Sequence, residues 1–116
     1  MLSFPHRFHG HGSLRYVYKN GQAVRTHLMT LKYVSNAHRT HSRFSVVVSK
    51  KVHKGAAGRN RIRRRLYEII RAELPRIKSP HDIVMIIFTN EIISMPSGEL
   101  VEAVRQLFSQ ADLYKK

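Results

Sequence analysis

The spacing of hydrophobic residues along the chain predicts three helices. The first covers residues 13–20, with Ser13 as its N-cap and Gly21 as a left-handed C-terminal stop. The second follows Gly58 and ends at Pro75, because proline cannot continue a helix. The last helix starts at residues 96–98. Residues assigned to the inner sides of the second and third helices are Ile62, Leu66, Ile69, Ile70, Glu73 or Leu74, Leu100, Val104, Leu107, Phe108 and Ala111.

Strand patterns occupy the segments between these helices. Residues 22–34 contain either a strand pair or one bent strand. Residues 43–49 form a strand with a β-branched run at its centre. Residues 83–88 are all apolar, which predicts a central strand buried on both faces. In the 22–34 segment, one face carries Met29, Leu31 and Tyr33, and the other carries Leu28, Thr30, Lys32 and Val34.

This order of elements predicts an α+β fold, an α/β two-layer arrangement of a sheet packed by helices. The whole chain, residues 1–116, is expected to be a single domain. Residues 1–12 show no hydrophobic period and are expected to form a flexible arm.

Charge is distributed very unevenly along the chain. Residues 1–67 contain 15 lysines and arginines and no acid, whereas residues 68–116 have a net charge of −1. Repulsion on this scale opposes folding unless a polyanion compensates it. Nucleic acid is therefore the favoured partner, with an anionic membrane surface second. The chain has no cysteine and no apolar run long enough to span a bilayer, so we expect a cytoplasmic protein.

The densest charge lies at residues 59–65, where five of seven residues are arginine. A solvated helix surface usually alternates its charges, but here only Glu68 lies within helical reach of Arg64 or Arg65. We therefore interpret this block as a phosphate-binding surface. The helical period places Tyr67 on the same outward side as the arginines.

Aromatic residues and histidines are further candidates for binding groups. Tyr18, close to Arg15, is the best candidate for stacking on an unpaired base, whereas Phe44 is assigned to the core. The histidine pairs His9–His11 and His38–His41 lack the further ligands that a structural metal site needs, so no protein metal site is predicted. No arrangement of side chains predicts catalysis by the protein itself.

One long motif is specific enough to suggest a family. Phe44-Ser-Val-Val-Val-Ser-Lys-Lys-Val52, a short Gly/Ala loop, and then Arg59-Asn-Arg-Ile-Arg-Arg64 resemble the signature of the bacterial ribonuclease P protein component. The resemblance extends to most of the chain. It implies an α-β-β-β-α-β-α fold with a four-stranded mixed sheet. It also implies a left-handed crossover through the arginine helix, against the general right-handed rule.

The resemblance implies a function as well. Members of the family pair with a catalytic RNA, and together they remove the 5′ leader from precursor tRNA. RNA-bound Mg²⁺ carries the chemistry, so the protein has no catalytic residues of its own. Residues matching the motif, and implied to contact the catalytic RNA, are Ser49, Lys50, Lys51, Arg59, Asn60, Arg61, Arg63 and Arg64.

A cleft between the first helix and the sheet is implied to hold the single-stranded leader. Its residues here are Arg15 and Tyr18 together with either Lys32 or Tyr33, depending on the strand register. Leu14 falls where many members have a second aromatic residue. The loop between Lys51 and Arg59 is one residue longer than the commonest form.

A ribosomal or general RNA-binding protein without a catalytic partner is the alternative interpretation. A DNA-binding helix-turn-helix protein is disfavoured, because the segment before the arginine helix has a strand pattern. The resemblance implies RNA partners, so neither DNA nor a membrane is an expected partner.

Overall fold

The computed structural model describes residues 11–36, 41–78 and 80–115. The predicted arm therefore lies mostly outside the described residues, as do His9 and His38. Along the chain the elements are α1 (His11–Asn20), β1 (Gln22–Arg25), β2 (Met29–Ser35), β3 (Arg43–Val47), α2 (Ala56–Glu73), η2 (Leu74–Arg76), β4 (His81–Ile87), η3 (Asn90–Ile93) and α3 (Ser97–Gln110).

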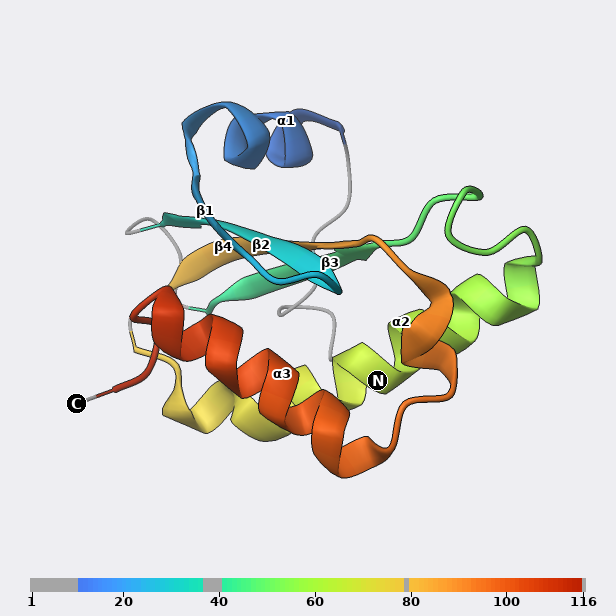
Figure 1. Cartoon of the computed structure of the whole chain (residues 1–116). Helices are drawn as coiled ribbons and strands as arrows, with labels where there is room; N and C mark the ends of the chain where they lie inside the picture. Colours follow the sequence, from blue (N-terminus) through green and yellow to red (C-terminus); the bar gives the residue numbers. More distant parts are fainter. Residues whose placement is uncertain (1–10, 37–40, 79, 116) are drawn as a thin grey trace.

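The four strands form one mixed sheet in the order β1-β2-β4-β3. β4 pairs antiparallel with β2 and parallel with β3, so the apolar strand is central as predicted. Residues 22–34 form a strand pair, β1 and β2, rather than one bent strand. α1 lies on one face of the sheet, while α2 and α3 cover the other (Figure 1).

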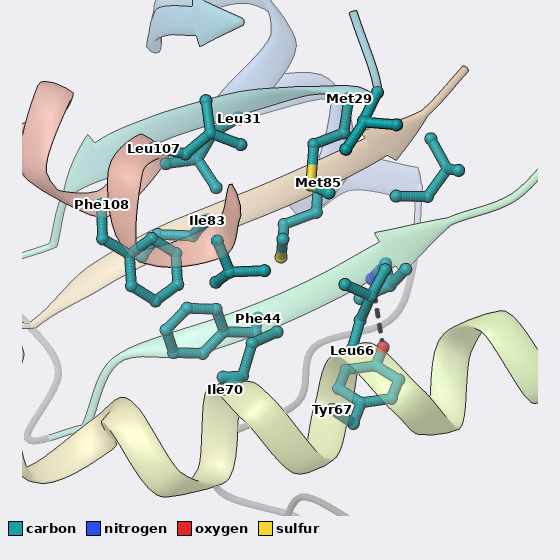
Figure 2. Packing of buried hydrophobic residues seen from close by; sticks show 14 of the residues in the cluster. Met29, Leu31, Phe44, Leu66, Tyr67, Ile70, Ile83, Met85, Leu107 and Phe108 are labelled. Carbon is teal, nitrogen blue, oxygen red and sulfur yellow. Dashed lines mark hydrogen bonds between the residues drawn. The ribbon is translucent and has the colours of Figure 1, made fainter. Parts of the chain in front are cut away.

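The main core lies between the sheet and the pair α2 and α3 (Figure 2). The rings of Phe44 on β3 and Phe108 on α3 lie with their centroids 6.2 Å apart. Around them pack fully buried residues from all layers, among them Leu31, Ile70 and Met85. The inner positions predicted for both helices are confirmed apart from Ile69, which is only partly buried. Of the alternatives Glu73 and Leu74, Glu73 is buried and Leu74 only partly so.

A second, smaller cluster attaches α1 to the opposite face of the sheet. Val17 is fully buried there against Val84 of β4, with Leu14, Val34, Val47 and Ile86 at its margin. The sheet is therefore apolar on both sides, but only the α2–α3 side carries a deep core.

Gly21 ends α1, but not in the predicted left-handed conformation. Its amide donates to the Val17 carbonyl oxygen at 2.8 Å, and its φ is not positive. A Cβ at this position would lie 2.5 Å from that oxygen and 2.9 Å from the Tyr33 carbonyl oxygen. Glycine is needed here because α1 and β2 approach too closely for a side chain. The helix also begins two residues before Ser13, which is therefore not its N-cap.

Two other predictions about burial are wrong. Tyr67 does not lie outside with the arginines, because its ring is buried and its hydroxyl accepts the Val46 N–H at 3.1 Å (Figure 2). Phe88 is not buried, because β4 ends at Ile87 and the Phe88 side chain is 48% exposed.

Glu73 is a buried carboxylate where α2, α3 and the C-terminal segment meet. Arg105 donates two hydrogen bonds to one of its oxygens, both at 3.3 Å. The Tyr114 hydroxyl donates to the other at 2.7 Å. Burial, together with this hydrogen bond, raises the pKa of Tyr114 above its ordinary value.

We expect Tyr114→Phe to lower the free energy of unfolding at pH 7 by roughly 1–3 kcal/mol, because a buried carboxylate loses a donor. A raised folded-state pKa contributes stability below about pH 10 that is lost as the pH rises further. The difference between wild type and variant should therefore shrink above about pH 10. Urea unfolding on either side of that pH measures it, with Tyr16→Phe as the exposed control. Equal stability of Tyr114→Phe and wild type at neutral pH would show that the bond contributes nothing.

Candidate RNA interface

The predicted basic surface forms where β3 leads into α2. The backbone turns sharply after β3, with the amides of Val52 and His53 donating to the Ser49 carbonyl oxygen at 3.1 and 3.3 Å. This turn leaves Ser49, Lys50 and Lys51 exposed at the edge of the sheet. Because α2 starts at Ala56, the lysine pair and the first arginines of the helix lie at the same end of the molecule (Figure 1).

The glycine at position 58 is explained by a contact with His53. A Cβ on Gly58 would lie 2.2 Å from the His53 ring, which therefore packs directly on the backbone of the first helical turn. The same ring accepts the Gly55 N–H at 3.1 Å. The glycines of this loop thus serve the packing of His53 against α2.

Arg59 holds this loop to the helix. Its Nη1 donates to the carbonyl oxygens of His53 at 2.9 Å and Lys54 at 2.8 Å. The side chain is half-buried. Arg59 therefore positions the loop that carries the lysines, a role that the sequence did not predict.

The remaining motif residues lie on the outer side of α2. Asn60, Arg61 and Arg64 are exposed, and Arg63 donates from Nη2 to the Asn60 side-chain oxygen. Glu68 forms its ion pair with Arg71 at 2.9 Å, not with Arg64 or Arg65. The first turn of α2 contains no acid. The outer side of this helix half is consequently a run of cations in which no acid intervenes before Glu68.

Arg65 belongs to the interior of the structure. Its guanidinium donates to three carbonyl oxygens at the end of η3: Ile92, Ile93 at 3.1 Å and Met95 at 2.6 Å. It connects α2 to the segment leading into α3. Of the five arginines in residues 59–65, two therefore have structural hydrogen bonds and three face outward or bond only to a neighbour on α2.

A second candidate surface lies on the α1 face of the sheet. Lys32 of β2 donates from Nζ to the Tyr18 carbonyl oxygen at 3.4 Å, and the same ammonium lies 5.5 Å from the centre of the Tyr18 ring. Tyr18 is 38% exposed, and partial burial raises the pKa of its hydroxyl. An aromatic ring and a cation are thus presented together beside α1. Arg15 is exposed on the same helix.

The strand register decides between Lys32 and Tyr33. Lys32 pairs with Val84, which packs under α1, whereas Tyr33 pairs with Ile83 in the main core. Tyr33 therefore lies on the opposite face, and its hydroxyl donates to the Gln22 side chain at 3.1 Å. Lys32 is the residue that shares a surface with Tyr18.

A cavity of about 770 Å³ lies elsewhere, beside α3 and the start of β2. Glu99, Glu102 and Arg105 contribute to its lining. Two carboxylates make this site unsuitable for a polyanion.

Two further findings concern metals and membranes. Among the described residues, no three histidine or acidic side chains come together as a metal site would require. Over the same residues, no helix combines the length and the apolar character needed to cross a bilayer.

Comparison with known proteins identifies the family. The family model for ribonuclease P matches residues 2–112. The chain belongs to the family of bacterial ribonuclease P protein components. It is 33% identical over 97 residues to the ribonuclease P protein component of a Synechocystis strain, covering 84% of this chain and 77% of that protein. It is 32% identical over 112 residues to that of a Pseudanabaena strain, covering 96% and 95%.

Solved structures support the same fold. The ribonuclease P protein of Staphylococcus aureus superposes with a TM-score of 0.84 at 22% identity, covering 95% of this chain and 98% of that one. The ribonuclease P protein of Thermotoga maritima gives a TM-score of 0.75 at 23% identity, covering 84% and 89%. As a ribonuclease P protein component, the chain is the RNA-binding subunit of a ribonucleoprotein endoribonuclease that processes tRNA.

We expect Arg65→Ala to lower the free energy of unfolding by roughly 1–3 kcal/mol, because the η3 carbonyl oxygens lose their donors. Arg64→Ala, one residue away and exposed, is the matched control and should stay within about 0.5 kcal/mol of wild type. Urea denaturation followed by circular dichroism measures both. If the two variants were equally stable, the hydrogen bonds of Arg65 would have no net effect.

Proposed function

We propose that the β3–α2 loop and the outer side of α2 bind the catalytic RNA of ribonuclease P. The observation that carries this is the group of exposed cations, Lys50, Lys51, Arg61 and Arg64, in a chain with no acid before Glu68. Guanidinium groups bind phosphate bidentately, and a bound phosphate relieves their mutual repulsion. Ser49, Asn60 and Arg63 add hydrogen-bonding groups to the same surface, and Arg59 keeps the loop in place.

The α1 face is proposed to bind the single-stranded 5′ leader of precursor tRNA. Tyr18 offers a ring for base stacking, while Lys32 and Arg15 offer charge for the backbone. The protein would thereby hold substrate and catalytic RNA together, and the RNA would perform the cleavage.

Mg²⁺ is proposed to be bound mainly by the RNA, where it would supply the Lewis-acid chemistry of phosphodiester hydrolysis. The described side chains offer no cluster of acids for this task. We further propose that the protein works in the cytoplasm. Mixing the protein with the candidate RNA of its organism should accelerate 5′ leader removal at low Mg²⁺, whereas the protein alone should cleave nothing.

We expect Arg61→Ala combined with Arg64→Ala to weaken assembly with the catalytic RNA while leaving the fold intact. Each lost phosphate contact should also make the salt dependence shallower, reducing the slope of log K against log [salt] by roughly 0.7–0.9. Filter binding between about 50 and 200 mM salt measures both effects. Arg71→Ala, already paired with Glu68, is the control. An unchanged slope in the double variant would show that these two arginines do not contact RNA phosphates.

Tyr18→Leu is expected to weaken binding of precursor tRNA by the assembled enzyme by about 1–3 kcal/mol, the value of one base–aromatic stack. The loss should appear only with substrates that carry a leader, so mature tRNA serves as a second ligand. Tyr33→Leu is the control. It removes a tyrosine that follows Lys32 on β2 but lies on the sheet face away from α1, so it should leave leader affinity unchanged. The proposal fails if both variants behave alike.

A further inference from the structure

Phe88 is an exposed aromatic ring with no evident role in the fold. β4 is otherwise buried from residue 82 to 87, apart from the partly buried Ile86, yet the residue that follows it is 48% exposed. Its amide still continues the sheet by donating to the Leu28 carbonyl oxygen at 2.9 Å. The backbone is therefore fixed while the ring remains open to solvent.

A cation lies beside this ring. The guanidinium carbon of Arg25, the last residue of β1, is 6.0 Å from the centre of the Phe88 ring. Arg25 pairs with Thr30, two residues along β2 from Lys32, so it points to the α1 face of the sheet. Arg25 and Phe88 thus repeat the combination of aromatic ring and cation that Lys32 and Tyr18 form.

The two pairs lie on one face, some distance apart. Phe88 lies opposite Leu28, and Lys32 is four residues further along β2, which corresponds to about 13 Å. Because β3 and β4 are parallel, Phe88 also lies at the same end of the sheet as Ser49, Lys50 and Lys51. The Arg25–Phe88 pair therefore lies on the α1 face at the end of the sheet from which the basic loop leaves.

Charge favours a nucleic-acid occupant over a protein one. Arg25, Lys50 and Lys51 are exposed cations at this end of the molecule. The nearest acid in sequence, Glu91, belongs to η3, which turns towards α2 and whose carbonyl oxygens bond to Arg65. A purely apolar partner would leave these cations without counter-charges, whereas a nucleotide supplies a base for the ring and a phosphate for the guanidinium.

We propose that Phe88 and Arg25 form a second base-stacking subsite for the single-stranded leader. The strand would run along the α1 face of the sheet from Tyr18 and Lys32 towards the basic loop. The inference rests on the proposed leader site and extends it by one aromatic position that the sequence pattern assigned to the core.

Tryptophan fluorescence gives a direct test, because the chain contains no tryptophan. Phe88→Trp places a single emitter at the subsite of the full-length protein. Adding a short single-stranded RNA, long enough to cover both aromatic positions, should quench its emission in proportion to binding, since stacking brings a base onto the indole ring. An unchanged emission at saturating RNA would overturn the proposal.

Affinity gives the second readout. Phe88→Leu should weaken binding of the same oligonucleotide about 5- to 150-fold, the range expected for the loss of one base–aromatic stack. Phe88→Tyr should restore binding. Tyr16→Leu, which removes a more exposed ring on another element, is the matched control. Added to the Phe88→Trp variant, it should leave the quenching of the tryptophan emission unchanged.

Two results would contradict the inference in distinguishable ways. If Phe88→Leu weakened assembly with the catalytic RNA but not oligonucleotide binding, the ring would contact the ribozyme. If wild type self-associated and Phe88→Leu did not, a second copy of the chain would be its occupant. A third result separates this inference from the proposed leader site: if Tyr18→Leu had no effect while Phe88→Leu did, the Tyr18 site would fail and the Phe88 subsite would be supported.

Discussion

The packing of α2 against the sheet is the constraint on which the RNA-binding surface depends. The arginines on the outer side of this helix repel one another, so contacts on its inner side must hold the helix to the sheet. The inner side buries apolar surface through Ile62, Leu66 and Ile70, and the Tyr67 hydroxyl accepts a hydrogen bond from the β3 backbone. At the C-terminal end of the helix, Glu73 accepts hydrogen bonds from Arg105 and Tyr114. These contacts are distributed along the helix, so its charged N-terminal half is presented as part of a rigid element.

The order of elements, the central strand and the inner sides of the helices could be predicted from the sequence, because hydrophobic periodicity reports burial directly. The handedness of the β3–α2–β4 crossover came only from the resemblance, since local rules favour the opposite sense. The burial predictions were wrong where the same side chain can be either buried or exposed. Tyr67 can face water or bury its ring and bond through its hydroxyl, and Phe88 extends an apolar run past the point where the strand ends.

The candidate sites were predicted less completely for a related reason. An arginine pattern reveals charge but not the carbonyl oxygens that a guanidinium will reach after folding. Arg59 and Arg65 therefore belonged to the same sequence signal as Arg61 and Arg64. In the fold, Arg59 and Arg65 donate to backbone carbonyl oxygens, whereas Arg61 and Arg64 are exposed. Strand alternation offered two registers for Lys32 and Tyr33, and only the pairing with β4 places Lys32 beside α1. Long-range pairing is the information that periodicity lacks.

The separation of charge also affects how the molecule meets its partner. Cations gather at the β3–α2 end, while Glu99 and Glu102 are exposed on α3. Where charge is distributed so unevenly, the field of a polyanion would exert a torque on the molecule before any contact forms. Approach would then be oriented, and a larger share of collisions would bring the correct side forward. Dissolved ions limit this effect to within about 8 Å of the surface at physiological ionic strength, so orientation happens in the last moments of the encounter.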